Sequence, residues 1–581
     1  MNKIFPFLDW IGKYKWSFLP SDLLAGITVA IVLIPQGLAY ALIAGLPAVY
    51  GLYASMVPLV VYTLFGTSRA LGVGPVAMDS LLVAAGLGAI ASVGPENYIA
   101  MAIVLAFLVG GIQFFLGIFR MGFLVNFLSR PVISGFTSGA ALIIMFSQLK
   151  YLLGIDMEGS SQLHLVLWNA FQKIGEINPF DLGIGIVGIL LMVLLRKWNR
   201  KLPYILIVVI LGILSVYFLQ LVTRDVGIVG EIPRGLPSVA LPELSGGVLM
   251  DLWPIALTLA LVGYLETITI GKGVEDKMNG DRLKANKELV ALGLSNMAGS
   301  LFQSYPITSS FSRSAIYYES KPRTNLATLF TALMVLLTLL FLTPLFYYLP
   351  NAVLASIIMV SVYGLVDISY AQILWKYRKD EFLVLITTFL LTLFVGIMEG
   401  ILTGVLISLL LMVYRTSNPH VAVLANIRGT PYYRNVDRFG SDALLRPDLL
   451  IVRFDAQLYF GNANFFKSHL MELIHQKGPA LNAVILNAES INYIDSSATQ
   501  TLKKLIESLY EKGIHFFIAG AIGPTRDILF SSGIMELLPK ECLFVETREA
   551  VEFFDDPAKK QELKDRVAYQ RNPVGNQGYR S

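Results

Sequence analysis

The sequence has few charged residues and almost no cysteine. Charged side chains make up 15% of its 581 residues, against about 25% in ordinary soluble domains. The single cysteine, Cys542, excludes an intramolecular disulfide framework, and no Cys/His spacing typical of a zinc site is present. The 45 basic residues nearly balance the 41 acidic ones, so the net charge of +4 does not indicate nucleic-acid binding. Without a Walker loop or a catalytic triad, we expect neither an enzyme nor a cofactor.

Hydrophobic residues are in excess, at 55% of the chain. From Asp22 to about Tyr414 they form apolar runs separated by short polar turns. Because a helix needs about 20 apolar residues to cross a bilayer, the runs predict fourteen spans. The predicted spans are 22–44, 47–66, 73–93, 97–119, 132–153, 179–196, 202–221, 249–270, 289–302, 304–318, 325–349, 351–366, 380–398 and 399–415. The first run leads straight into a second one, so no cleavable signal peptide is predicted.

Basic residues are concentrated in alternate loops. If the N-terminus is cytoplasmic, the loops after even-numbered spans are cytoplasmic as well, and basic residues such as Arg69, Arg120, Lys287, Lys321 and Lys379 lie in them. The opposite loops 45–48, 94–97 and 350–351 have none, although two longer ones contain Lys173, Arg224 and Arg234. This is the positive-inside pattern. We therefore expect a multi-pass protein of the cell membrane with both termini cytoplasmic.

Two spans begin with residues that do not favour a helix. Gly72–Ala77 opens the third span and Ser304–Ser310 opens the tenth, seven spans later, as two halves of inverted topology would require. Backbone groups left free there are tolerated only beside a cavity or inside protein. Half-helices that meet at mid-membrane are the usual anion site of secondary transporters. The alternative is that these are packing glycines and simple kinks. Pro35 is expected to interrupt the first span in the same way.

Arg313 lies one to two turns after Pro306 and follows several serines. A charged residue at such depth is costly and is by default a functional candidate. It would add a positive charge to the helix end, while serine hydroxyls donate to anion oxygens. Alternatively, Arg313 extends to the cytoplasmic surface.

Glu266 lies in an apolar run with no basic residue before Lys272. A carboxyl group in this setting could bind and release a proton. The alternative is a structural ion pair between Glu266 and Arg313. Gln36 and Tyr40, one helical turn apart in the first span, complete a polar cluster, unless they are ordinary contacts between helices.

These motifs resemble those of the sulfate permease (SulP) family. The resemblance is carried by Pro35–Ala41, Gly45–Pro47, Val49–Tyr53, Phe65–Arg69, Gly74–Ala77, Gly135–Ala140 and Ser310–Ser314. The C-terminal part resembles the STAS domain of the same family, so the resemblance covers nearly the whole chain. It implies an α-helical polytopic membrane protein of fourteen helices in two inverted seven-helix repeats, with a core domain that moves against a gate domain, and a cytoplasmic α/β STAS domain.

The domains implied are a cytoplasmic N-terminal segment (1–21), a transmembrane transport domain (22–415), a STAS domain (416–555) and a disordered tail (556–581). The resemblance further implies a homodimer in the lipid bilayer. By motif, the anion site comprises Gln36, Tyr40, Val76, Ala77, Ser310, Phe311, Ser312 and Arg313. Glu266 matches a position where proton-coupled members carry an acidic residue.

The C-terminal part predicts alternating strands and helices. Strands are expected at 449–454, 483–486 and 515–519, and helices at 496–512 and 524–537. Asp495 and Ser496 form a good helix N-cap. They also resemble the loop that is phosphorylated in soluble STAS proteins, with Ser496 as acceptor, although transporters often do not use this site.

The leading hypothesis is a secondary active anion transporter, most specifically for proton-coupled sulfate uptake, as the Gln-Gly-Leu-Ala-Tyr-Ala motif of the sulfate-transporting branch implies. Sulfate and protons are then its partners. One alternative is a carrier of bicarbonate or dicarboxylates, with sodium as a candidate coupling ion. Another is an anion channel, or a sensor that signals through the STAS domain.

Overall fold

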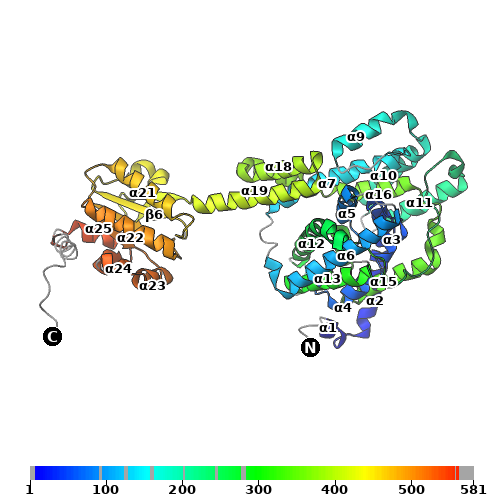
Figure 1. The fold of residues 1–581 in the computed structure, drawn as a ribbon, viewed down its shortest axis with the longest axis horizontal. Coiled ribbons are helices and arrows are strands. Elements are labelled where there is room, and N and C mark those ends of the chain that lie inside the picture. The colour runs from blue at the N-terminus through cyan, green and yellow to red at the C-terminus, as the bar shows by residue number, and fades with distance from the viewer. Residues whose placement is uncertain are drawn as a thin grey trace. The chain divides into compact units, whose positions relative to one another are not determined.

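The computed structural model describes residues 7–90, 95–123, 129–157, 162–199, 203–242, 246–275, 283–538, 540–556, 558, 559 and 561. These form two compact units, Met1–Ser408 and Leu409–Ser581. Figure 1 shows the first unit as helical and the second as a sheet with helices. The helix α19 (Ile397–Ser417) runs through the boundary between the units.

The helices of the first unit form two groups that pack mainly within themselves. One group, called the core group here, contains α2 (Leu19–Ile43), α4 (Val57–Phe65), α5 (Ala77–Ile90), α6 (Pro95–Ile118), α12 (Gly246–Glu275), α13 (Ala285–Ser300), α14 (Phe311–Ser320) and α15 (Leu326–Leu337). The other, the gate group, contains α7 (Arg130–Ser147), α10 (Pro179–Trp198), α11 (Tyr204–Phe218), α16 (Asn351–Tyr363), α18 (Lys379–Phe394) and α19, whose glycines Gly400 and Gly404 lie against α18. The helices α2 and α5 also contact the gate group, through α16, α11 and α7.

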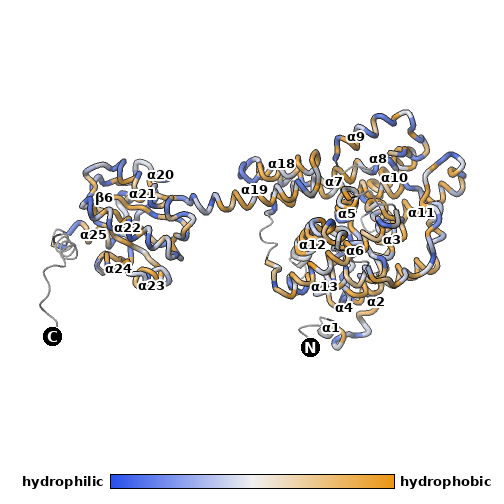
Figure 2. The backbone as a smooth tube through the Cα atoms, in the orientation of Figure 1, coloured by the Kyte–Doolittle hydropathy of each residue, from blue (hydrophilic) through white to orange (hydrophobic). Residues whose placement is uncertain are grey.

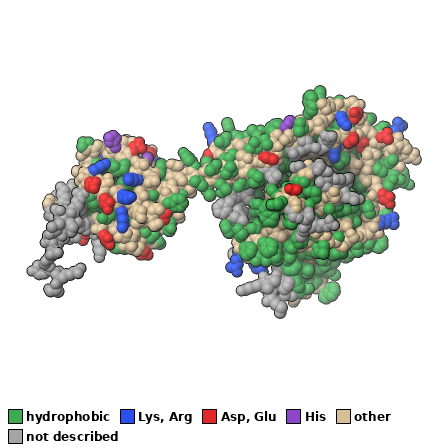
Figure 3. Space-filling model, in the orientation of Figure 1, with side chains coloured by type: hydrophobic (Ala, Val, Ile, Leu, Met, Phe, Trp, Pro, Cys, Tyr) green, Lys and Arg blue, Asp and Glu red, His purple; other side chains and the backbone are tan. Residues whose placement is uncertain are grey.

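Each of the fourteen predicted spans contains a helix of the structure. Among the described residues, 8 helices are long and apolar enough to cross a membrane. Many large apolar side chains on them are exposed, and apolar residues dominate the first unit in Figures 2 and 3. The polytopic helical fold is therefore confirmed, while the total of fourteen spans stays a prediction. The short helices α9 (Leu163–Gln172) and α17 (Ile368–Tyr377) were not predicted.

Two short strands meet inside the first unit, at the points where the sequence predicts broken helices. β1 (Gly72–Gly74) pairs antiparallel with β2 (Thr308–Ser310), so that Gly72 lies opposite Ser310 and Gly74 opposite Thr308. All six residues are buried. Each strand leads into a helix, β1 into α5 and β2 directly into α14. The two interruptions are thus one structural feature, called the crossing here, in which each strand satisfies the backbone groups of the other.

Glycine is required in β1 because the chain comes very close to α14. A Cβ atom on Gly72 would lie 2.5 Å from the Cβ atom of Arg313 and 2.9 Å from its carbonyl carbon. Gly74 has φ 138°, a backbone conformation that other residues rarely adopt. These two glycines therefore set how closely the third and tenth spans approach.

The prediction that Pro35 interrupts the first span is wrong. α2 continues from Leu19 to Ile43 with Pro35 inside it. Proline removes one intrahelical hydrogen bond, but neighbouring helices pack around this part of α2 and hold it helical, as is common in membrane proteins. Gln36 and Tyr40 therefore lie on one continuous helix.

The second unit is an α/β domain built on one mixed sheet. Its main strands follow the order β4-β3-β6-β7-β8-β9, and β6 to β9 are parallel. The strands are β3 (Val421–Ile427), β4 (Tyr433–Asn435), β5 (Ala443–Leu444), β6 (Leu449–Phe454), β7 (Ala483–Asn487), β8 (His515–Ala519) and β9 (Leu543–Phe544). The helices are α20 (Val436–Phe439), α21 (Ala463–Lys477), α22 (Ser496–Glu511), α23 (Gly523–Ser531), α24 (Ile534–Leu537) and α25 (Thr547–Asp555).

The three strands predicted in this domain agree with the structure to within one residue. The single helix predicted over 524–537 is wrong, because Gly533, with φ 76°, divides it into α23 and α24. The predicted domain boundaries stay predictions. Of the tail 556–581, predicted to be disordered, nearly all residues lie outside those described.

We expect Gly72→Ala to destabilise the transport unit, because the new methyl group would overlap atoms of Arg313 that cannot move independently of α14. Overpacking of this kind costs about 1–3 kcal/mol. A thermal unfolding scan of the purified protein measures the effect. Gly88→Ala is the matched control, since a Cβ atom on this glycine of α5 meets nothing within 4 Å. Equal midpoints for the two variants would contradict the close approach at Gly72.

Candidate functional site

The crossing brings the N-termini of two helices to the interior of the first unit. Ala77 is the first residue of α5, preceded by Val76, and Phe311 is the first residue of α14, preceded by Ser310. The first backbone N–H groups of a helix have no partner within that helix, and the helix dipole makes this end positive. Two such ends close together favour an anion.

Arg313 provides a full positive charge at the same place. Its side chain is fully buried, with 0% exposed, so it does not extend to the cytoplasmic surface. Its Nη1 atom donates to Oε1 of Gln36 over 3.4 Å, while Nε and Nη2 have no protein partner. Nη2 lies 3.4 Å from the position that a Cβ atom on Gly74 would occupy. The guanidinium group thus lies against the crossing, and two of its nitrogen atoms can still donate hydrogen bonds to a ligand.

The helix α2 contributes Gln36 and Tyr40 to the same cluster. Gln36 is fully buried and its Nε2 atom has no partner. Tyr40 is 4% exposed and lies within electrostatic range of Arg313. The structure therefore brings together three residues that the sequence predicts for the site, from spans one and ten.

The remaining predicted residues lie around the helix ends. Ala77 and Ser310 are buried, whereas Phe311 is 48% exposed and Ser312 is also exposed. The Ser310 and Ser312 hydroxyls lie 3.1 Å apart. Phe311 and Ser312 thus mark the open side of the start of α14, while Arg313 faces inward.

Tyr305 and Ser80 belong to the same cluster but were not predicted. Tyr305 is fully buried within electrostatic range of Arg313, and its hydroxyl lies 3.2 Å from that of Ser80 on α5. Tyr305 precedes Pro306 in the segment 304–310, where the sequence predicts a helix interruption. It could therefore have been predicted as a site residue from that position.

Hydrogen bonds to α12 and α13 fix β2 and the residue before it in place. The Thr308 hydroxyl donates to the Gly263 carbonyl over 2.8 Å, and the Thr267 hydroxyl donates to Ser309 over 2.9 Å. Asn296 holds both backbone groups of Ile307, accepting from its N–H at 2.8 Å and donating to its carbonyl at 3.1 Å. The orientation of α14 therefore depends on these neighbouring helices.

Glu266 lies on α12 beside this network and is 7% exposed. Its Oε2 atom has no partner, and among the described residues it forms no ion pair with Arg313. The alternative of a Glu266–Arg313 ion pair is therefore wrong. A second buried carboxyl group belongs to Asp79 on α5. Asp79 is 2% exposed, and its Oδ1 atom also has no hydrogen-bond partner. Asp79 was not predicted, although a lone carboxyl group in the third span was a visible signal.

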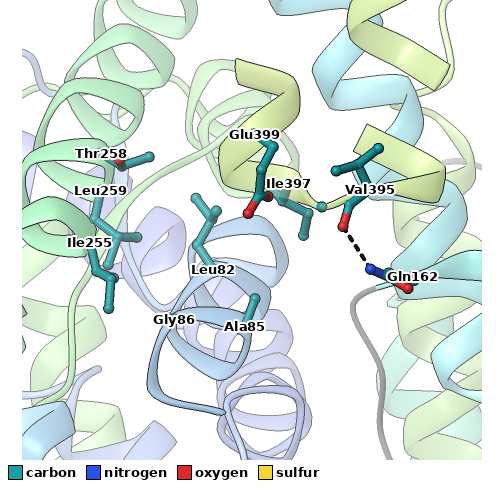
Figure 4. A pocket seen from close by; sticks show the side chains of 11 residues that line it. Leu82, Ala85, Gly86, Gln162, Ile255, Thr258, Leu259, Val395, Ile397 and Glu399 are labelled. Atoms are coloured by element: carbon teal, nitrogen blue, oxygen red, sulfur yellow. Dashed lines mark hydrogen bonds between the residues drawn. The ribbon is translucent and has the colours of Figure 1, made fainter. Parts of the chain in front are cut away.

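A cavity of about 230 Å³ opens between α5, α12 and the turn before α19 (Figure 4). Figure 4 shows Glu399 extending toward Leu82 and Gln162 bonded to the carbonyl of Val395. The lining residues are Leu82, Ala85, Gly86, Gln162, Ile255, Thr258, Leu259, Val395, Gly396, Ile397 and Glu399. Within the described part of the chain, no group of three or more His, Cys, Asp or Glu side chains could hold a metal ion.

In the second unit, Asp495 caps α22. Its carboxylate accepts from the N–H of Ala498 at 2.8 Å and from that of Phe460 at 2.9 Å. Ser496, the first residue of α22, is exposed. The predicted N-cap is confirmed.

Comparison with known proteins gives matches over both units. Residues 19–388 match the sulfate permease family and residues 441–551 match the STAS domain. Sulfate transporter 4.1, chloroplastic, of Arabidopsis thaliana is 38% identical over 575 residues, which are 95% of this chain and 82% of that protein. Probable sulfate transporter 4.2 of the same plant is also 38% identical, over 95% and 84% of the two chains. The solved structure of the murine Solute Carrier 26 family member A9 anion transporter, in its inward-facing state, superposes with a TM-score of 0.87 at 26% identity, over 95% and 94%.

Proposed function

Because the chain belongs to the sulfate permease family, whose members are transporters and not enzymes, we propose that it is a secondary active transporter for sulfate, driven by protons. The anion binds at the crossing, between the start of α5 and the start of α14. The proposed binding residues are Gln36, Tyr40, Val76, Ala77, Ser310, Phe311, Ser312 and Arg313.

The buried, incompletely bonded guanidinium group of Arg313 is the observation that carries this proposal. Its Nε and Nη2 atoms are shielded from water and without a protein partner. Leaving a buried charge without partners is expensive. A tetrahedral oxyanion supplies both the opposite charge and several acceptor oxygens. The open N–H groups at the two helix ends add donors on other sides of the same space.

Sulfate is proposed over other anions because the relatives that match nearly the whole chain bear the name of sulfate transporters. Sulfate carries two negative charges, and Arg313 provides one positive charge. A proton on Glu266, which lies on the helix α12 that packs against β2, would offset part of the remaining charge while the core group moves. Each sulfate would then be carried together with a proton, because the proton reduces the net negative charge that the core group carries.

Transport is proposed to occur by alternating access, with the core group moving against the gate group while the anion stays at the crossing. The protein is proposed to work as a homodimer in the cell membrane, with both termini cytoplasmic. The transport domain spans 22–415 in this proposal, and the STAS domain 416–555.

Arg313→Ala is expected to weaken sulfate binding by about ten-fold or more, since a charge-assisted hydrogen bond contributes about 1.5–3 kcal/mol. Calorimetric titration of the purified protein with sulfate measures the affinity. Arg323→Ala is the matched control, because it removes an exposed basic side chain shortly after α14. The proposal is contradicted if both variants bind as tightly as the unaltered protein.

Glu266→Gln is expected to abolish the acceleration of sulfate uptake by an inward proton gradient, because an amide cannot take up the coupling proton. Uptake of labelled sulfate into proteoliposomes, with and without the gradient, measures it. If the unaltered protein takes up no sulfate in either condition, the sulfate assignment is wrong. If the variant still responds to the gradient, the proton role of Glu266 is wrong.

The regulatory role proposed for Ser496 is phosphorylation. A phosphate on this residue would sit at the N-terminus of α22, which favours negative charge, but next to the Asp495 carboxylate, which opposes it. Mass spectrometry of the protein isolated from its own membranes, under sulfate-replete and sulfate-starved conditions, tests this role. Phosphate on Ser496 in one condition is the expected result, and an unmodified Ser496 in both would rule the role out.

A further inference from the structure

Two buried carboxyl groups from different spans face the same region of the core group. Asp79 lies in the first turn of α5, and Glu266 lies on α12. Glu266 is within electrostatic range of Asp79. A Cβ atom on Gly263, one turn before Glu266, would lie 3.4 Å from Oδ2 of Asp79, so the Asp79 carboxyl group reaches the surface of α12.

Neither carboxyl group has the partners that two ionised groups would need. Asp79 Oδ1 and Glu266 Oε2 are buried and accept no hydrogen bond. The titratable and polar groups around them are Tyr305, Ser80, Thr267 and Thr308. The buried cation Arg313 is bonded to Gln36 and to neither carboxyl group. Among the described residues, no lysine, arginine or histidine forms an ion pair with either carboxyl group.

From this arrangement we propose that Asp79 and Glu266 act as one unit that shares the coupling proton. The inference rests on the proposed proton-driven transport and adds to it a second carboxyl group. Two carboxylates close together in a site of low dielectric cannot both be ionised, so the pair holds one proton between them. On loading, an oxygen of the pair forms the O–H bond with a proton from water, and on release the proton returns to water on the other side.

The cavity described above is lined by the same two helices that carry the pair. On α5, Leu82 and Gly86 follow Asp79 by three and seven residues, and on α12, Leu259 and Thr258 precede Glu266 by seven and eight. Residues at these spacings share one face of a helix. The carboxyl groups therefore lie on the helix faces that continue into the cavity lining, one to two turns away from it.

Asp79→Asn is expected to move the pH of half-maximal, gradient-accelerated sulfate uptake about one unit or more toward acid. The reason is that the variant removes the negative charge that helps Glu266 to hold the shared proton. The measurement is labelled sulfate uptake into proteoliposomes at a series of external pH values. A purely structural role for Asp79 would lower the amount of active protein without moving this midpoint.

Asp181→Asn is the matched control. Asp181 is another buried carboxyl group of the first unit, 1% exposed, but it lies on α10 in the gate group. Its replacement is expected to leave the midpoint where it is in the unaltered protein.

The outcomes separate the inference from the function on which it rests. If a proton gradient fails to accelerate uptake by the unaltered protein, the proposed coupling is wrong. If the gradient acts and Glu266→Gln abolishes its effect, but Asp79→Asn keeps the original midpoint, the coupling stands and the shared proton is overturned.

Infrared difference spectroscopy gives a second readout that does not need transport. The unaltered protein is expected to show the C=O stretch of a protonated carboxyl group at pH 7, and both Glu266→Gln and Asp79→Asn are expected to lose it at that pH. Asp79→Ser replaces Asp79→Asn if the latter does not fold. The band persisting unchanged in the Asp79 variant would overturn the proposal.

Discussion

The antiparallel pairing of β1 with β2 is the constraint on which the rest of the transport unit depends. Inside a membrane, backbone groups must find partners within the protein, and these two short strands supply partners to each other. Their pairing fixes where α5 and α14 begin and leaves the first N–H groups of both helices open. It also requires glycine at Gly72, because the backbone of α14 lies too close for a side chain.

The charges of the interior are arranged around this pairing and kept apart from one another. Arg313 is bonded to Gln36, while Glu266 lies on α12 and the Asp79 carboxyl group reaches the surface of that helix. A direct ion pair between Arg313 and one of these carboxyl groups would neutralise both charges, so neither group would attract an anion or a proton. In the proposed function, the separate Arg313 charge binds the anion and the carboxyl groups bind the proton. Binding of either ligand then lowers the electrostatic cost of binding the other.

The sequence was informative wherever local chemistry decides the structure. Apolar runs of membrane length located the helices, and the Gly-Pro and Pro-containing segments located the two interruptions, although not the strands that form there. The sequence was misleading at Pro35, because tertiary packing, and not the missing hydrogen bond, decides whether a helix continues. It gave no way to choose between the partners of Arg313, since the choice of Gln36 over Glu266 depends on how spans far apart in the chain pack. Asp79 was overlooked for the same reason, because its proposed role depends on Glu266, which lies in another span.

The central claim is that the anion lies at the crossing. The most direct measurement is a cryo-electron microscopy map of the protein in lipid nanodiscs with saturating sulfate, compared with a map without it. The account predicts additional density between Ala77 and Ser310, within hydrogen-bond distance of the Arg313 guanidinium group. Sulfate density in the cavity beside Glu399, with none at Arg313, would contradict it.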